Sequence, residues 1–247
     1  MTSTDPALPH RSLRAMTERN VVTDQNHTGA LVVEDLALLM FNPRNGAVVG
    51  DGLPFFHVLA GAVLIDLLLQ DRLSLEQERH GVRQVRTVGG TRPDLEVLAT
   101  AWDEIDRKPM DLYTMVLVLG PRLREPVLDL LVDRGHLRRE PGRGLLRIPT
   151  LAENDGTRRT HLVATMRAVL NDGSEPDVHT AAVAALLFAS GQLASMHADI
   201  PWSGAVHANA RKLQRSSWAA TAAGQAVQVS MASLIATNLF TATSILD

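Results

Sequence analysis

The sequence predicts a mainly α-helical protein, built as a single multi-helix domain from which one β-hairpin protrudes. Apolar residues recur at helical spacing in most segments after residue 30. Glycine and proline separate these segments at short intervals, as they do where helices end. Two short extended runs flank a tight turn within residues 136–150, a pattern that is typical of a hairpin. A chain of 247 residues has ample material for one core of this kind.

Composition excludes several functional classes. The sequence is 45% hydrophobic and 21% charged, the balance of an ordinary soluble protein. Its net charge of −3 argues against a protein that coats nucleic acid non-specifically. The absence of cysteine excludes disulfides, cysteine-ligated zinc and thiol nucleophiles. Lysine occurs only at Lys108 and Lys212, and we interpret this preference for arginine as GC-rich coding and hence as a bacterial origin.

The two ends of the chain have different characters. Residues 1–29 are polar and unpatterned, which predicts a flexible tail ahead of a helical domain at 30–247. The tail has no apolar core followed by a cleavage site, so it is not a secretory signal. Residues 216–246 carry no charge and raise the question of a membrane span. Their many Ser, Thr, Ala and amide residues favour instead a buried last helix at about 217–240.

The elements before residue 110 follow from apolar periodicity and from residues that begin or end helices. Pro54 introduces a strongly apolar helix, and Asp94 is placed to cap an amphipathic helix that contains Trp102. In order, we expect a helix at 31–40, a turn at 42–46, a helix at 55–69, a short strand at 73–76, a loop at 89–93 and a helix over 95–105.

The central stretch, residues 111–150, predicts a winged-helix-like segment. A first helix begins at Asp111 and is stopped by Gly120 and Pro121, and a second helix ends at Arg134 before Gly135. Two extended runs follow at 136–139 and 144–150, with a turn at 140–143 between them. Helix, turn, helix and hairpin is the order of elements in a winged helix.

Four helices are expected after the hairpin. The first is amphipathic and spans Thr157–Leu170. Glu175, Pro176 and Asp177 begin the second, which is apolar nearly all round over 181–196 and is therefore predicted to lie centrally. Pro201 begins the third, and the uncharged segment near the end of the chain forms the fourth.

The sequence contains no catalytic motif that we can identify. It lacks the nucleophile elbow, the zinc-protease helix motif and the phosphate-binding loop. His179, His197 and His207 match no metal-ligand spacing, so we interpret them as surface or core residues. Asp66, near a helix end, is better explained as a cap or an ion-pair partner than as a general base. We therefore predict no catalytic residue, no metal site and no cofactor.

Arginine is concentrated between residues 121 and 147, where the sequence has seven arginines and four acidic residues. Arg122 and Arg124 precede Glu125 and Pro126, which are typical of a helix start. Free amide groups and a partial positive charge at that start, beside two guanidinium groups, would form a phosphate-binding seat. The equally supported alternative is a solvated arginine face that pairs with Glu125 and Asp129.

The hairpin tip is the second candidate feature. Leu145 and Leu146 lie between Arg143 and Arg147, so two apolar side chains are flanked by cations. Such a tip suits a membrane surface or a partner subunit. The alternative is that the leucines pack inward.

The order of segments resembles the Golgi phosphoprotein 3 family, peripheral membrane proteins that recognise phosphatidylinositol 4-phosphate. The resemblance covers roughly Leu31–Thr237. It rests on LVVEDLALLMF, on LAGAVLIDLLLQDRLSLE, on the Trp102 helix, on LREPVLDLLVDRGHLRRE with its hairpin, and on AALLFASGQLASM. It implies an all-α fold, a headgroup bound in a basic pocket, and membrane insertion or oligomerisation through the hairpin.

The headgroup positions of the family carry over only in part. One arginine of the arginine-rich turn falls on Arg124, and its companion falls on Pro121, with Arg122 as a possible substitute. A further family arginine falls on Ala60, and the tryptophan ahead of it falls near Asp51. Three of the four positions therefore differ from the family pattern.

The function expected from these observations is that of a non-enzymatic peripheral membrane protein. It would bind anionic, phosphoinositide-like lipid headgroups through Arg122 and Arg124. The hairpin tip would contact the membrane or a second copy of the chain. The protein is expected in the cytoplasm, where it would bind the inner face of the membrane.

Two alternative functions use the same residues differently. A winged-helix nucleic-acid-binding protein would use the helix ending at Arg134 for recognition and Arg143 and Arg147 to grip phosphates. Nucleic acid is the less favoured partner, because that helix is mainly Leu and Val and has few side chains that can recognise bases. A small-molecule-binding protein or enzyme would use a remodelled headgroup pocket with His57 as acid or base. Core positions for Phe55 and Phe56 are the competing interpretation.

Overall fold

The computed structural model describes residues 29–77, 83–141 and 149–215. Contacts divide the chain into two units, Met1–Ala30 and Leu31–Asp247, and every helix and strand given below belongs to the second.

The described residues are mainly helical, as predicted. The helices are α2 (Val32–Met40), α3 (Leu53–Leu69), α4 (Glu96–Arg107), α5 (Leu112–Asp133), α6 (Thr157–Leu170), α7 (Val178–Ala189), the 3-10 turn η2 (Leu193–Met196) and α8 (Gly204–Arg215). Three small antiparallel sheets accompany them. Their strands are β1 (Phe41–Asn42) with β2 (Ala47–Val48), β3 (Leu73–Gln77) with β4 (Arg83–Thr87) and β5 (Met110–Asp111), and β6 (Leu137–Glu140) with β7 (Thr150–Glu153).

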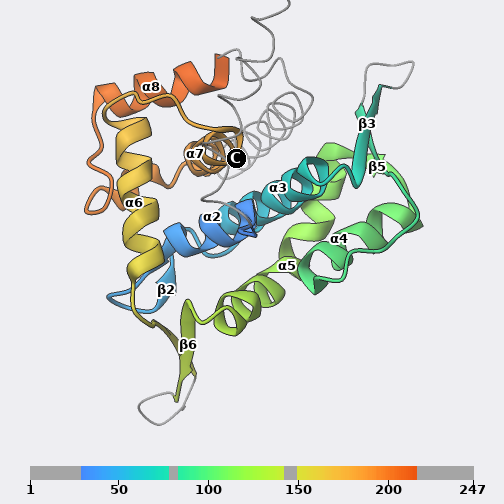
Figure 1. Cartoon of the computed structure of the whole chain (residues 1–247), viewed down its shortest axis with the longest axis horizontal. Coiled ribbons are helices and arrows are strands. Elements are labelled where there is room, and N and C mark those ends of the chain that lie inside the picture. Colours follow the sequence, from blue (N-terminus) through green and yellow to red (C-terminus); the bar gives the residue numbers. More distant parts are fainter. Residues whose placement is uncertain (1–28, 78–82, 142–148, 216–247) are drawn as a thin grey trace, which may run out of the picture. The chain divides into compact units, whose positions relative to one another are not determined.

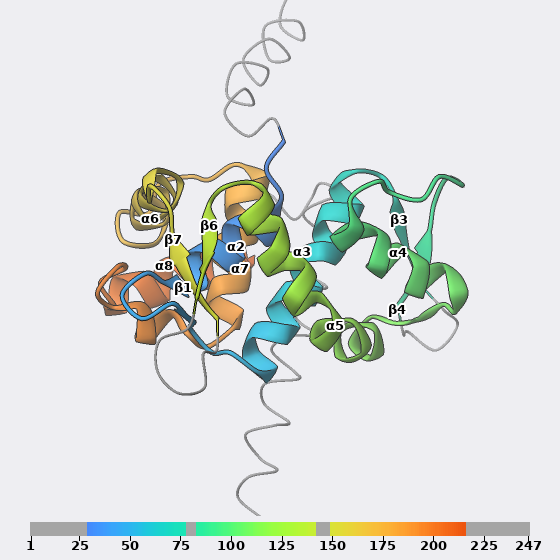
Figure 2. The same ribbon diagram turned by 90° about the horizontal axis from the view of Figure 1, so that it is seen from below.

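The core is centred on α2 and α3. Every residue of α2 is buried, and so are the residues of α3 from Val58 to Leu67. Helices α4 and α5 lie to one side of this pair and α6, α7 and α8 to the other (Figures 1 and 2). Because α3 has neighbours on opposite sides, its sequence is apolar nearly all round rather than on one face.

Helix α5 is one helix, so the predicted break at Gly120 and Pro121 is wrong. A Cβ atom at position 120 would lie 2.7 Å from the carbonyl oxygen of Phe56, so glycine is required where α5 crosses α3 closely. Proline inside a helix costs about 3 kcal/mol. Fully buried Leu119 and Leu123 flank the site, and burial of a leucine contributes roughly 1.5–3 kcal/mol. Packing thus offsets the local penalty, and the helix-turn-helix of a winged helix is not formed.

Residues predicted to begin or end helices do so at Asp177 and Gly135, whereas two other predicted boundaries differ from the structure. Asp177 caps α7 by accepting a hydrogen bond of 2.7 Å from the amide of Thr180, and Gly135 follows α5 with a φ of +73°. Asp94, in contrast, does not cap α4, whose N-cap is Leu95 without a side-chain hydrogen bond. The helix predicted over 181–196 ends at Ala189, and η2 follows as a separate turn.

The predicted hairpin is present as β6 and β7. The two strands pair in the register Leu137 to Glu153 and Glu140 to Thr150, so the pairing continues to Glu153, beyond the predicted end at 150. The tip residues Arg143, Leu145, Leu146 and Arg147 lie outside the described residues, as does the expected last helix at 217–240.

The short strand predicted at 73–76 is present as β3, and its partner β4 was not predicted.

Candidate functional site

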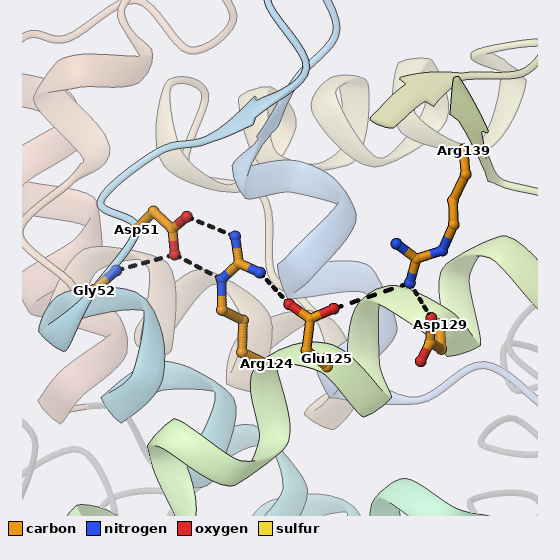
Figure 3. A network of polar contacts seen from close by, with 6 residues as sticks. All are labelled: Asp51, Gly52, Arg124, Glu125, Asp129 and Arg139. Atoms are coloured by element: carbon orange, nitrogen blue, oxygen red, sulfur yellow. Dashed lines mark hydrogen bonds and ion pairs between the residues drawn. The ribbon is translucent and has the colours of Figure 1, made fainter. Parts of the chain in front are cut away.

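The best-defined polar contact on the predicted arginine face joins Arg124 to Asp51. Arg124 Nε donates to Asp51 Oδ1 at 3.0 Å, and Arg124 Nη2 donates to Asp51 Oδ2 at 2.7 Å (Figure 3). Arg124 lies on α5, and Asp51 lies in the loop between β2 and α3. The contact is therefore a two-point fork between residues 73 positions apart in the chain, which sequence periodicity does not reveal.

This fork continues into a row of alternating charges. Arg124 Nη1 also donates to Glu125, whose other oxygen lies 3.9 Å from Arg139 Nη2, and Arg139 in turn contacts Asp129. We name Asp51, Arg124, Glu125, Arg139 and Asp129 the charge row. It connects the loop before α3, the middle of α5 and the base of the hairpin. Two cations face three carboxylates in it, so its own charge sums to −1.

The fork sets the protonation state of both partners. The hydrogen bond from Arg124 is the largest cause that lowers the pKa of Asp51 below its usual range, and the same bond raises the pKa of Arg124. Both groups are therefore charged at neutral pH. Their side chains are 42% and 31% exposed, so solvent reaches the pair and weakens its contribution to stability.

Arg122 occupies a separate contact on the same helix. Its Nη1 lies 2.6 Å from Glu104 Oε2 on α4, and Arg107 Nη1 approaches the same oxygen at 2.7 Å. The Glu104 side chain is 11% exposed, whereas that of Arg122 is 56% exposed. Arg122 thus ties α5 to α4, while much of its side chain stays in solvent.

The structure lacks the helix start on which the predicted phosphate-binding site depended. Arg122 and Arg124 both lie within α5, so no helix begins at Glu125 and Pro126 and the free amide groups predicted there are absent. Of the seven arginines between 121 and 147, each of the five described ones contacts an acidic side chain: Arg122, Arg124, Arg134, Arg138 and Arg139. The alternative interpretation, in which arginines pair with Glu125 and Asp129, describes the arrangement at the charge row.

The four positions that the resemblance assigns to a headgroup are found in different surroundings. Asp51 and Arg124 are in direct contact. Pro121 lies inside α5, one turn from Arg124. Ala60 is fully buried in α3.

A second polar cluster, inside the core, joins four helices. Asp66 of α3 is fully buried and accepts hydrogen bonds from the first amides of α2, so it is a cap, as predicted for this residue, but of a neighbouring helix. Asp35 of α2 is also buried and contacts His179 of α7 at 2.9 Å and Arg158 of α6. Burial would lower the pKa of His179, but its bond with Asp35 and the nearby acidic charges outweigh burial and raise that pKa.

His57, the acid–base candidate of the small-molecule hypothesis, is a buried residue of α3. Burial lowers its pKa, and its Nδ1 has no hydrogen-bond partner among the described residues. Phe55 is fully buried and Phe56 is partly buried against the core, which supports the core interpretation of these residues. Within the described part of the chain, no group of three or more potential ligands is placed to hold a metal ion.

None of the described helices is both long enough and apolar enough to span a membrane. A family model for Golgi phosphoprotein 3 (GPP34) matches the chain over residues 32–229. No curated protein matches the sequence.

Proposed function

The chain belongs to the Golgi phosphoprotein 3 (GPP34) family, and from this premise we propose that it is a non-enzymatic peripheral membrane protein that binds anionic, phosphoinositide-like lipid headgroups. The observation that carries the proposal is the contact between positions 51 and 124, which the family resemblance assigns to one headgroup site. The proposed location is the cytoplasmic face of a membrane.

Arg124 and Arg122 are the proposed headgroup contacts. A guanidinium group offers a planar pair of N–H donors that matches two oxygens of a phosphate as well as it matches a carboxylate. Both side chains reach solvent from α5, so an incoming phosphate would exchange with Asp51 at one arginine and with Glu104 at the other. The exchange at Asp51 involves two partly exposed side chains, and at buried Glu104 the contact with Arg107 would remain.

The hairpin is the proposed second contact with the membrane or with another copy of the chain. At its base, Arg139 contacts Asp129 of α5, and Arg138 contacts Glu140 at 2.7 Å. The contacts of Arg139 with Asp129 and Glu125 hold β6 beside α5, whereas the Arg138 pair lies within β6. The tip residues Leu145 and Leu146, with Arg143 and Arg147, would then add apolar and cationic contacts to those of the headgroup site.

The expected affinity is low. A basic residue near an anionic bilayer contributes about 1 kcal/mol, and the charge row has no net positive charge of its own. Binding should therefore be weak, should weaken further as salt rises, and should be reversible.

Vesicle flotation tests the proposal. We expect the protein to float with phosphatidylcholine vesicles that contain phosphatidylinositol 4-phosphate and not with phosphatidylcholine alone. The Arg122→Ala/Arg124→Ala variant should lose this difference. Arg92→Ala is the control for loss of an ion-paired arginine, because Arg92 is partly exposed, lies in the loop before α4 and contacts Asp103. Equal flotation with both kinds of vesicle, or full binding by the double variant, would contradict the proposal.

Neither alternative function gains support from a described residue. The nucleic-acid hypothesis relied on a helix-turn-helix, and α5 is continuous through the predicted turn. The small-molecule hypothesis relied on His57, whose side chain is buried among core residues.

A further inference from the structure

Each of the three guanidinium nitrogens of Arg124 contacts an acidic side chain. Nε and Nη2 donate to the two oxygens of Asp51, and Nη1 donates to Glu125. The edge formed by Nε and Nη2 is the one that holds two oxygens of a phosphate side by side. In this structure a carboxylate of the chain itself fills that edge.

Apart from Arg124, Asp51 forms hydrogen bonds with backbone groups close to it in the chain. Its side chain also accepts a hydrogen bond of 3.0 Å from the amide of Gly52, and its own amide donates to the carbonyl of Val48 at 3.3 Å. The residue lies in a loop, and its side chain is 42% exposed. Moving the carboxylate off Arg124 therefore breaks surface hydrogen bonds and leaves the core intact.

We propose that Asp51 is an internal counter-anion that closes the Arg124 site, so that a headgroup phosphate binds only by displacing it. This inference rests on the proposed function and adds its regulation. Asp51 competes with the phosphate for Arg124 from within the same molecule, and therefore at a high effective concentration. Only a ligand that binds Arg124 more strongly than Asp51 does would open the site.

The threshold depends on the charge of the ligand. A phosphodiester carries one negative charge, the same as Asp51, and gains no electrostatic advantage by replacing it. A phosphomonoester carries more charge near neutral pH and presents three strong acceptor oxygens. The site should consequently bind phosphomonoesters more tightly than phosphodiesters, whether the phosphate belongs to a lipid headgroup or is free in solution.

The test compares full-length wild type with Asp51→Asn, which keeps the side-chain shape and removes the charge. Binding is measured on phosphatidylcholine vesicles with either phosphatidylinositol 4-phosphate or the diester phosphatidylglycerol at equal surface charge. We expect Asp51→Asn to bind the monoester vesicles on the order of tenfold tighter, since a charge-assisted hydrogen bond no longer has to be displaced. Adding Arg124→Ala to Asp51→Asn should abolish the gain.

Asp103→Asn is the matched control. Asp103 also contacts an arginine through its carboxylate, its side chain is 40% exposed, and its loss changes the net charge by the same amount. A gain shared by both variants would reflect net charge alone and would overturn the inference. If Asp51→Asn lowers the melting temperature substantially, Asp51→Ser replaces it with the same expectation.

The outcomes separate the inference from the proposed function. Wild-type binding to anionic vesicles with no gain in Asp51→Asn beyond the control overturns the inference and leaves the function standing. Calorimetric binding of inorganic phosphate by Asp51→Asn, without vesicle binding by any variant, supports the closed site and overturns the lipid function. Absence of both kinds of binding in every variant overturns both.

Discussion

The carboxylate of Asp66 on α3 accepts a hydrogen bond of 3.0 Å from the backbone amide of Val33 in the first turn of α2. Its second oxygen accepts from the amide of Val32 at 2.8 Å, so a fully buried side chain of one helix caps the start of another. Burial raises the pKa of Asp66 to about 7, even though both amide bonds favour the charged form.

We expect this carboxyl group to make stability depend on pH. Because the folded pKa is raised, the folded protein keeps a proton that the unfolded chain has lost between pH 3.8, the usual pKa of an aspartate, and about pH 7. The unfolding free energy should fall as pH rises through this window and level off above it, a total on the order of 4 kcal/mol. The raised pKa of His179 acts in the same direction above pH 6.5, where stability is lost as pH rises through its folded pKa.

Urea unfolding at a series of pH values checks this prediction. The difference in unfolding free energy between wild type and Asp66→Asn isolates the contribution of Asp66 from those of the histidines. That difference should become smaller by about 2–3 kcal/mol between pH 5 and pH 8. A difference that stays constant over this range would show that Asp66 does not titrate there.

Gly120→Ala should destabilise the protein. The new Cβ atom would lie 2.7 Å from the carbonyl oxygen of Phe56 and 2.9 Å from its Cβ atom, so α5 and α3 would have to separate. We expect a loss of about 1–3 kcal/mol by chemical denaturation, in spite of the better helix propensity of alanine. Gly204→Ala, at the start of α8 with nothing within 4 Å of the new atom, should be neutral or slightly stabilising. Equal effects of the two substitutions would contradict the close crossing.

Asp177→Ala and Asp94→Ala should differ in their effects. Asp177 caps α7 through the amide of Thr180, and removal of an N-cap costs about 0.5–2 kcal/mol. Asp94 lies ahead of α4 without capping it, so its replacement should stay within about 0.5 kcal/mol of wild type. Comparable losses in both variants, measured by thermal unfolding, would indicate that Asp94 is a cap after all.

Local patterns predicted most of the helices because burial and helix ends are encoded within a few residues. The amphipathic spacing over Thr157–Leu170 gives the bounds of α6, and Asp177 marks the start of α7. Gly120 and Pro121 misled the prediction, since a glycine that ends a helix and a glycine that permits a close helix crossing look alike in one sequence. Only the position of Phe56 distinguishes them.

The sequence predicts which arginines form the candidate site, but it does not predict which acidic residues they contact. Arginines at 122 and 124 with acidic neighbours indicate a charged face, but neither residue reveals its distant partner. Arg124 meets Asp51 and Arg122 meets Glu104 only because α3, α4 and α5 pack together. Such contacts depend on the tertiary structure, which is why the sequence left the phosphate seat and the paired arginine face as equal alternatives.

The most direct test of the account is the side-chain NMR signal of Arg124. The Nε–Hε resonance reports the partner of this nitrogen, which is Asp51 in the free protein. A titration with a short-chain phosphatidylinositol 4-phosphate should shift the Arg124 signal in a saturable way and leave that of Arg92, bound to Asp103, unchanged. An Arg124 signal that stays in place at lipid concentrations where the protein binds vesicles, or one that moves together with Arg92, would contradict the claim that Arg124 holds the headgroup.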